Sequence, residues 1–201
     1  DRVILSAMQS ISDELRLDKR QAPPADLMVL RHRYPPAQWP AHRNYGELAA
    51  FWLQVHAGLR GQGRVLAETT RDFREARIDI ATFGRVFAGQ LRDYLQHLEG
   101  HHRIEDLHYF PRFRALDNRL VAGFDLLEND HEIIHAQVLT VVESAQALLR
   151  DIERGGDAPR YSADAYSDRA ERLHGLLDRH LDDEEALVIP SILEYSEAAL
   201  R

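Results

Sequence analysis

The chain has 201 residues, 44% of them hydrophobic, which is enough for one domain with a buried core. Its net charge of −8 argues against nucleic acid and membrane surfaces as partners, because both require a basic face. The absence of cysteine excludes disulfides, thiolate zinc sites, iron–sulfur clusters and cysteine nucleophiles.

Targeting and membrane segments are not visible in the sequence. No apolar run approaches the roughly 20 residues that a membrane-spanning helix needs, and no signal peptide is recognisable. The chain begins at Asp1 rather than Met, which is compatible with removal of an upstream segment. We therefore expect a cytoplasmic protein.

Residues 1–43 differ from the rest of the chain, because prolines interrupt any long helix there. These prolines are Pro23, Pro24, Pro35, Pro36 and Pro40. We predict a short helix near residues 3–17, followed by an extended arm. The arm is a candidate for packing against the domain that follows, residues 44–201, or for forming a homo-oligomer.

Four long segments after the arm carry apolar residues at helical spacing. They cover about 44–71, 79–109, 118–154 and 162–188, and a short fifth segment, 191–200, follows Pro190. No segment alternates with the period of a strand, and the connections are short. The sequence predicts an all-α fold, an up-down-up-down four-helix bundle with an N-terminal arm and a short C-terminal helix.

Histidine and glutamate interrupt the apolar stripe of each long helix, and 7 of the 11 histidines lie between His56 and His135. The residues concerned are His56 on the first helix, His101 and Glu105 on the second, His131 and His135 on the third, and His180 and Glu184 on the fourth. Residues i and i+4 share one face of a helix, so each pair points toward the core together. A buried carboxylate without a partner is very costly, and a metal cation would compensate it.

A hidden repeat with an offset of 79 residues relates the two halves of the domain. It pairs His56 with His135, His101 with His180, and Glu105 with Glu184. Two hairpins with matching ligands predict a pseudo-twofold site for two metal ions. The partner of His131 would be Trp52, so one ion would have an extra histidine and the other an open position for a small molecule.

These motifs, with HHRIEDLHYFP on the second helix and HLDDEEALVIP on the fourth, resemble the hemerythrin-like, HHE cation-binding family over about residues 44–195. The resemblance implies a non-haem centre of two iron ions with a bridging oxo or hydroxo group. Glu105 and Glu184 would bridge the ions. The terminal ligands would be His56, His101, His131, His135 and His180.

Several points stay open at the level of sequence. Glu185 is an alternative to Glu184, and His102 is a further candidate ligand beside His101. A zinc site and a ferritin-type site built on ExxH pairs are rival readings. For function we expect binding or sensing of O2, or of another diatomic molecule or peroxide. The alternatives are a diiron enzyme acting on peroxide, O2 or nitric oxide, and an iron-responsive regulatory module with the arm as its output.

Overall fold

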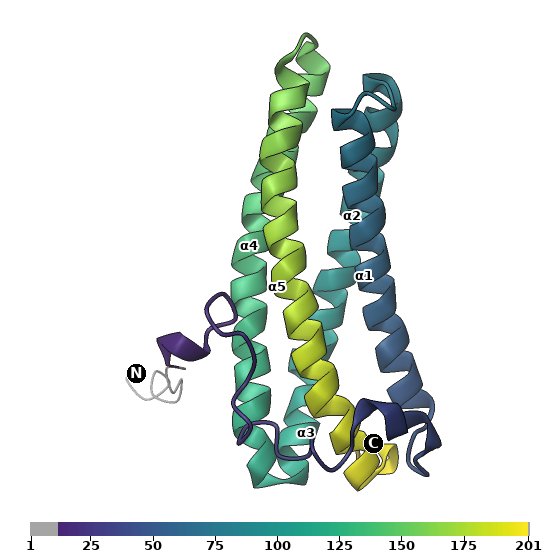
Figure 1. The fold of residues 1–201 in the computed structure, drawn as a ribbon, viewed down its shortest axis with the longest axis vertical. Coiled ribbons are helices and arrows are strands. Elements are labelled where there is room, and N and C mark those ends of the chain that lie inside the picture. Colours follow the sequence, from purple (N-terminus) through teal and green to yellow (C-terminus); the bar gives the residue numbers. More distant parts are fainter. Residues whose placement is uncertain (1–11, 201) are drawn as a thin grey trace.

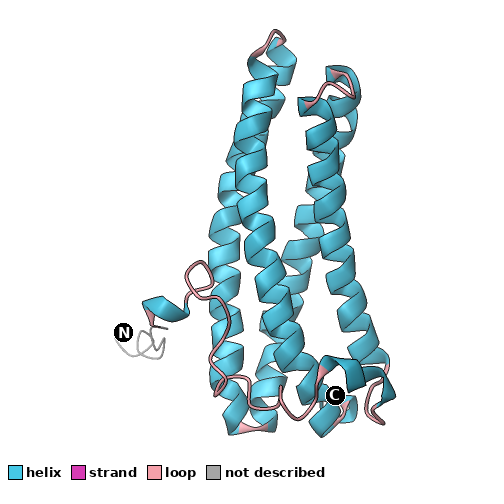
Figure 2. Ribbon diagram, viewed as in Figure 1, coloured by secondary structure: helices cyan, strands magenta, loops and turns pink. Residues whose placement is uncertain are grey.

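The computed structural model describes residues 12–200. Four long helices form the bundle: α1 (Glu47–Arg74), α2 (Ile80–Ile104), α4 (Val121–Arg154) and α5 (Ala158–Tyr195). They lie side by side and alternate in direction (Figure 1). The described part of the chain contains helices and loops but no strand (Figure 2). The predicted all-α bundle is therefore confirmed. No helix among these residues is both long and apolar enough to cross a bilayer.

The connection between α2 and α4 departs from the predicted continuous helix over 79–109. Helix α2 ends at Ile104, and a π-helical turn, η3 (Glu105–Tyr109), leads into a short helix, α3 (Phe110–Leu116), and a 3-10 turn, η4 (Asn118–Leu120). Pro111 has no N–H to donate to the carbonyl four residues earlier, which disfavours a regular α-helix there. Turns of this kind are frequent at functional sites, and this one begins at Glu105.

The predicted break at Pro190 and the separate short C-terminal helix over 191–200 are wrong. Helix α5 continues through Pro190 to Tyr195, and only a 3-10 turn, η5 (Glu197–Leu200), follows. Ile189 and Leu193 beside the proline are buried in the core, so tertiary packing outweighs the lost backbone hydrogen bond. The start of this helix also differs from the prediction, since it begins at Ala158 rather than near residue 162.

The arm packs against the bundle. The predicted helix near residues 3–17 lies largely outside the described residues, and its described part contains only a 3-10 turn, η1 (Asp13–Leu15). From there the arm passes beside α4 and crosses the lower end of the bundle (Figure 1), where a second 3-10 turn, η2 (Pro36–Ala41), precedes α1. Its apolar side chains Leu17, Met28, Leu30 and Trp39 are buried.

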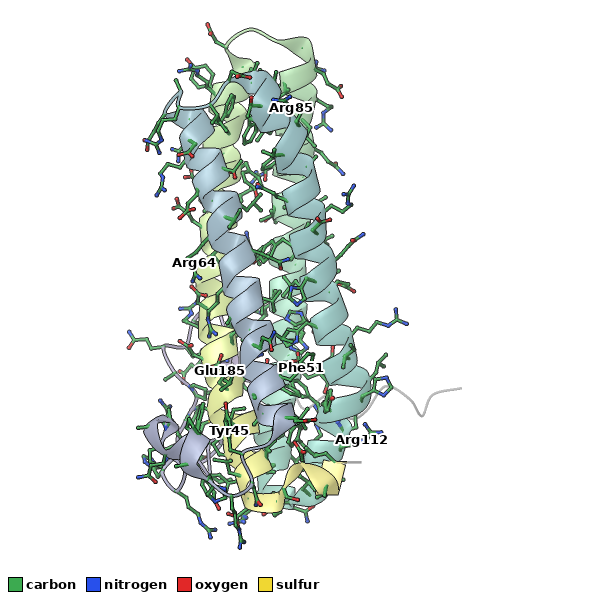
Figure 3. All side chains as sticks on the ribbon, turned by 90° about the vertical axis from the view of Figure 1, so that its right-hand side faces the viewer. Tyr45, Phe51, Arg64, Arg85, Arg112 and Glu185 are labelled. Atoms are coloured by element: carbon green, nitrogen blue, oxygen red, sulfur yellow. The ribbon has the colours of Figure 1, made fainter. Side chains whose placement is uncertain are left out.

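Two apolar clusters fill the bundle. Toward its upper end lies a group that we call the distal core, comprising Phe73, Phe83, Phe87, Leu148 and Tyr166. Toward the lower end, around Trp52, Phe110 and Phe124, lies a second cluster that the arm helps to cover. Figure 3 shows Arg85 near the upper end, whereas Phe51 and Glu185 lie in the lower half. The polar residues singled out in the sequence lie between the two clusters.

Candidate metal centre

The structure brings together six of the seven predicted ligands. They come from all four long helices and from the start of the π turn, and none has a side chain more than 7% exposed. We call this set the site layer, and it consists of His56, His101, Glu105, His131, His180 and Glu184.

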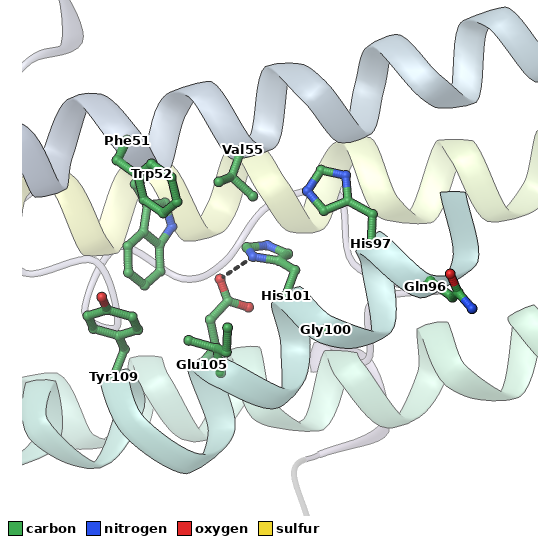
Figure 4. A pocket seen from close by; sticks show the side chains of 10 residues that line it. Phe51, Trp52, Val55, Gln96, His97, Gly100, His101, Glu105 and Tyr109 are labelled. Carbon is green, nitrogen blue, oxygen red and sulfur yellow. Dashed lines mark ion pairs between the residues drawn. The ribbon is translucent and has the colours of Figure 1, made fainter. Parts of the chain in front are cut away.

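The two carboxylates of the site layer each lie between two histidines. Glu105 places Oε1 3.0 Å from Nδ1 of His101 and Oε2 3.6 Å from Nε2 of His131. Glu184 places Oε1 3.3 Å from Nε2 of His56 and Oε2 3.4 Å from Nε2 of His180. Figure 4 shows the pair formed by His101 and Glu105. His56 and His101 form one group of histidines, and His131 and His180 form the other. Each carboxylate therefore lies between one histidine of the His56/His101 group and one of the His131/His180 group.

His135 does not face this site, so the expectation that it points to the core is corrected. Its side chain is 57% exposed, and its nearest acidic partner is the exposed Glu99, 3.8 Å away. The buried face of α4 includes Asp130, His131 and Ile134, which places position 135 on the flank of the helix. The structural counterpart of His56 is therefore His131, 75 residues later rather than 79, a shift of about one helical turn.

His102 lies in the site beside the predicted ligands. Its ring stacks on that of His131 at 4.0 Å between centroids, and it is 8% exposed. One nitrogen each of His102, His131 and His180 lie within 4.8 Å of one another, as do donor atoms of His56, His101, Glu105 and Glu184. The sequence predicts His102 only as a further candidate ligand beside His101, and the structure places it in the same buried site.

A second set of carboxylates holds the outer nitrogens of three histidines. Glu185 contacts Nδ1 of His56 at 2.9 Å, and Asp106 contacts Nδ1 of His131 at 2.8 Å. Glu185 and Asp106 each follow a site-layer glutamate in the sequence, so the repeat extends to this outer set. Such partners orient a ligand ring and leave the other nitrogen free for a metal. Glu184 therefore faces the centre, and its rival Glu185 lies outside it.

Asp130 holds the outer nitrogen of His180 and was not identified from the sequence. Its Oδ2 lies 3.4 Å from Nδ1 of His180. Arg20 of the arm binds both oxygens of Asp130, with Nη1 2.7 Å from Oδ1, and also contacts Asp183 at 3.0 Å. The arginine side chain is only 3% exposed. The arm thus reaches the site layer through a single carboxylate.

The comparison with known families agrees with this geometry. A family model described as the hemerythrin HHE cation-binding domain matches residues 47–195, which span the four long helices. The chain belongs to this family. The predicted resemblance is therefore confirmed, and the fold is that of a cation-binding domain. The comparisons found no match among curated proteins and none among solved structures.

Burial and charge shift the pKa values within this HHE domain in opposite directions. Burial lowers the pKa of His101 to about 3 and also lowers that of His102 and His131. Burial acts in the same way on His180, but Asp130 and Glu184 outweigh it and raise its pKa to about 9. Burial also acts to lower the pKa of His56, but Glu184 and Glu185 outweigh it and raise that pKa. The site thus combines neutral rings, which are suited to metal binding, with two more basic rings.

The two glutamates of the HHE domain are also unlike each other. Burial, reinforced by the charge of Glu184, raises the pKa of Glu105 well above its usual value. Burial also acts to raise the pKa of Glu184, but His56 and His180 outweigh it and hold that pKa well below its usual value. Without a cation, one of the two carboxyls is thus held ionised while its neighbour favours the protonated form.

At the candidate metal centre, six buried ligand atoms have no hydrogen-bond partner among the described residues. They are Nε2 of His56, His101 and His102, both oxygens of Glu105 and Oε2 of Glu184. Most buried polar atoms in proteins are paired, and each exception calls for an explanation. Imidazole and carboxylate donors converging on one layer fit transition-metal cations such as iron. The residues present therefore fit the cation that the family implies.

Proposed function

We propose that this HHE domain holds two iron ions and binds or senses O2 or a related small molecule. The observation that carries the proposal is the position of Glu105 and Glu184. Each contacts one histidine of the His56/His101 group and one of the His131/His180 group. Two carboxylates in such positions serve two ions better than one. The six donors of the site layer also exceed the four that a structural zinc ion takes.

In this proposal His56 and His101 hold one ion, and His131 and His180 hold the other, with His102 as a further candidate ligand. Iron supplies coordination positions for small ligands together with accessible changes of oxidation state. Asp106, Asp130 and Glu185 fix the orientation of the histidine rings. The apolar clusters above and below the layer shield it from solvent along the axis of the bundle.

A second candidate function is an iron-responsive regulatory module. It is favoured by the contact between Arg20 of the arm and Asp130, because loss of iron would change the position of His180 and hence the support for the arm. The alternative of a diiron enzyme acting on peroxide, O2 or nitric oxide uses the same site. Catalytic turnover of such a substrate would distinguish the enzyme from a protein that only binds its ligand.

The test is metal content per chain on freshly purified protein, with absorption spectra recorded after reduction and again after aeration. We expect about two irons and a visible band that forms and disappears reversibly. Irreversible oxidation would favour the enzyme, and release of the arm on iron removal would favour the regulatory module. One zinc ion, or no metal, would contradict the proposal.

A matched pair of variants tests the ligand assignment. His131→Ala should lose most of the iron, because this residue lies in the site layer. His135→Ala, one turn away on the same helix, should keep about two irons because its side chain is exposed. Equal iron content in both variants would show that the assignment is wrong.

A further inference from the structure

A cavity of about 330 Å³ lies between α1 and α2 and ends on the site layer. Its inner end is formed by the buried side chains of His101 and Glu105, two of the lining residues drawn in Figure 4. Its outer edge includes Phe51 and Ile104, whose side chains are 59% and 51% exposed. The cavity therefore connects the surface of the bundle with the His56/His101 side of the metal centre.

The size of the cavity exceeds what a diatomic ligand or peroxide requires. A water molecule occupies about 30 Å³ in the liquid, so a cavity of 330 Å³ has room for a body of roughly ten non-hydrogen atoms. Cavities that bind small organic molecules start at about 300 Å³. An organic molecule with a single ring matches this volume.

The chemistry of the lining indicates a neutral, apolar occupant. The walls are made by Phe51, Trp52, Val55, Ile104 and Tyr109 together with two uncharged polar side chains, Gln96 and His97. The rings of Trp52 and Tyr109 meet edge to face at 4.9 Å. No lysine or arginine lines the cavity, and its one carboxylate, Glu105, lies at the inner end. A charged ligand would thus find no counter-ion along these walls, whereas an apolar body would be shielded from water.

Gly100 leaves one side of this cavity open. It lines the cavity on α2, and a Cβ atom added there would meet nothing within 4 Å. Glycine is among the least favourable residues in a helix, so its presence here weakens α2 locally. A larger side chain would project into free space without displacing the backbone.

We propose that this cavity binds a small, neutral organic molecule with an apolar body of one ring, held beside the metal centre. This inference deepens the proposed function by naming the chemical class of substrate or effector, and its role rests on that function. The binding itself depends only on the walls and can therefore be measured with or without iron.

The experiment follows binding of 4-fluorotoluene to the full chain by 19F NMR, on protein as purified and after removal of iron. We expect saturable binding with a Kd on the order of 1 mM for a probe of this size. Gly100→Leu should weaken binding by about tenfold or more, because the new side chain occupies the cavity. The smaller Gly100→Ala should have an intermediate effect.

Gly89→Leu provides the matched control. Gly89 lies on the same helix, an added Cβ there also meets nothing within 4 Å, and the residue does not line the cavity. Its affinity for the probe should stay within about twofold of the unmodified chain. Both leucine variants should unfold at the same or a higher temperature than the unmodified chain, because leucine is the better helix former.

The outcomes separate this proposal from the proposed function. Absence of saturable binding, unchanged binding in Gly100→Leu, or equal losses in both leucine variants would overturn the cavity proposal. So would a concentration-dependent dimer that Gly100→Leu abolishes, since the patch would then be an interface between two copies. Two irons without probe binding overturn the cavity proposal alone. Probe binding to a chain that carries no iron as purified would overturn the proposed function alone.

Discussion

The distal core and the site layer occupy the same four helices but are built from opposite chemistry. In the distal core Phe73, Phe83 and Phe87 stack at 4.4 and 4.7 Å between ring centroids, and Tyr166 meets Phe87 edge to face. These rings pack against one another, and the Tyr166 hydroxyl is the one polar atom of these four side chains; it has no hydrogen-bond partner among the described residues. In the site layer, by contrast, histidine and glutamate are equally buried, and several of their donor atoms lack a hydrogen-bond partner among the described residues.

The difference shows which region stabilises the fold and which depends on a cation. Burial of aromatic and aliphatic side chains lowers the free energy of the folded state directly. Burial of polar groups raises it unless they are paired. Because apolar clusters lie on both sides of the site layer, the helices hold the ligands in place without help from the metal.

The largest effect should come from truncating the distal core. Phe87 is fully buried, and Phe87→Ala should lower the free energy of unfolding by about 3–5 kcal/mol. The iron content per folded chain should not change, because no ligand is touched. Urea unfolding with and without iron, together with metal analysis, measures both quantities.

His180→Ala tests the site layer in the same way. The contrast between the site layer and the distal core would fail if this variant behaved like Phe87→Ala. The variant should lose iron and the stability that iron adds. Any loss of stability in the iron-free chain should depend on pH, because His180 stabilises that chain only while its ring is charged beside Asp130 and Glu184. A large loss that is the same at every pH would show that the site layer supports the fold on its own, as the distal core does.

The regular parts of both regions could be predicted from the sequence. Apolar residues at helical spacing predicted the four helices, and pairs at i and i+4 predicted that His101 with Glu105, and His180 with Glu184, share a face. The same rule failed for His135. Spacing alone does not show where the edge of a buried stripe lies, and on α4 the stripe includes Asp130 instead.

Contacts between segments distant in the sequence left no periodic signal. Arg20 lies in an irregular arm, 110 residues before Asp130, so neither residue indicates the other. The π turn at Glu105 and the continuation of α5 through Pro190 both depend on tertiary packing rather than on local preference. The sequence therefore predicted the inner ligands better than the groups that orient them.

A substitution in the arm should have a smaller effect, and it tests whether the arm supports the metal centre. Arg20→Gln should weaken iron binding by about 10–100-fold, because Asp130 would no longer be fixed against His180. Competition with a chromophoric iron chelator measures the affinity, and limited proteolysis measures whether the arm stays bound.

Arg33→Gln is the matched control for this effect. Arg33 belongs to the same arm and pairs with Glu194 at 2.8 Å, but it contacts no residue of the outer carboxylate set. Its iron affinity should be unchanged within about twofold. Equal losses in both variants would assign the effect to general loosening of the arm. No loss in Arg20→Gln would show that Asp130 supports His180 without help from the arm.

The smallest effect is the pH dependence of the iron-free chain, because the shifts in the site layer partly oppose one another. The pKa values of His101, His102 and His131 are lowered, so the unfolded chain takes up protons there first and stability falls as pH drops below about 6.5. The pKa of His180 is raised to about 9 and that of His56 is also raised, so their contributions are complete below about 6.5 and are lost as pH rises through the raised pKa values.

These opposing trends predict a stability maximum near pH 6.5 for the iron-free chain, although the raised pKa of Glu105 reduces the slope on the acid side. Urea midpoints measured between pH 4 and 9 test the maximum. Phe87→Ala should lower the whole profile without changing its shape, because no group of the distal core titrates in that range. His180→Ala should flatten only part of the alkaline side, because the raised pKa of His56 still contributes there. A profile that changes shape in Phe87→Ala would mean that the two regions are coupled, and the separation between fold and site would then fail.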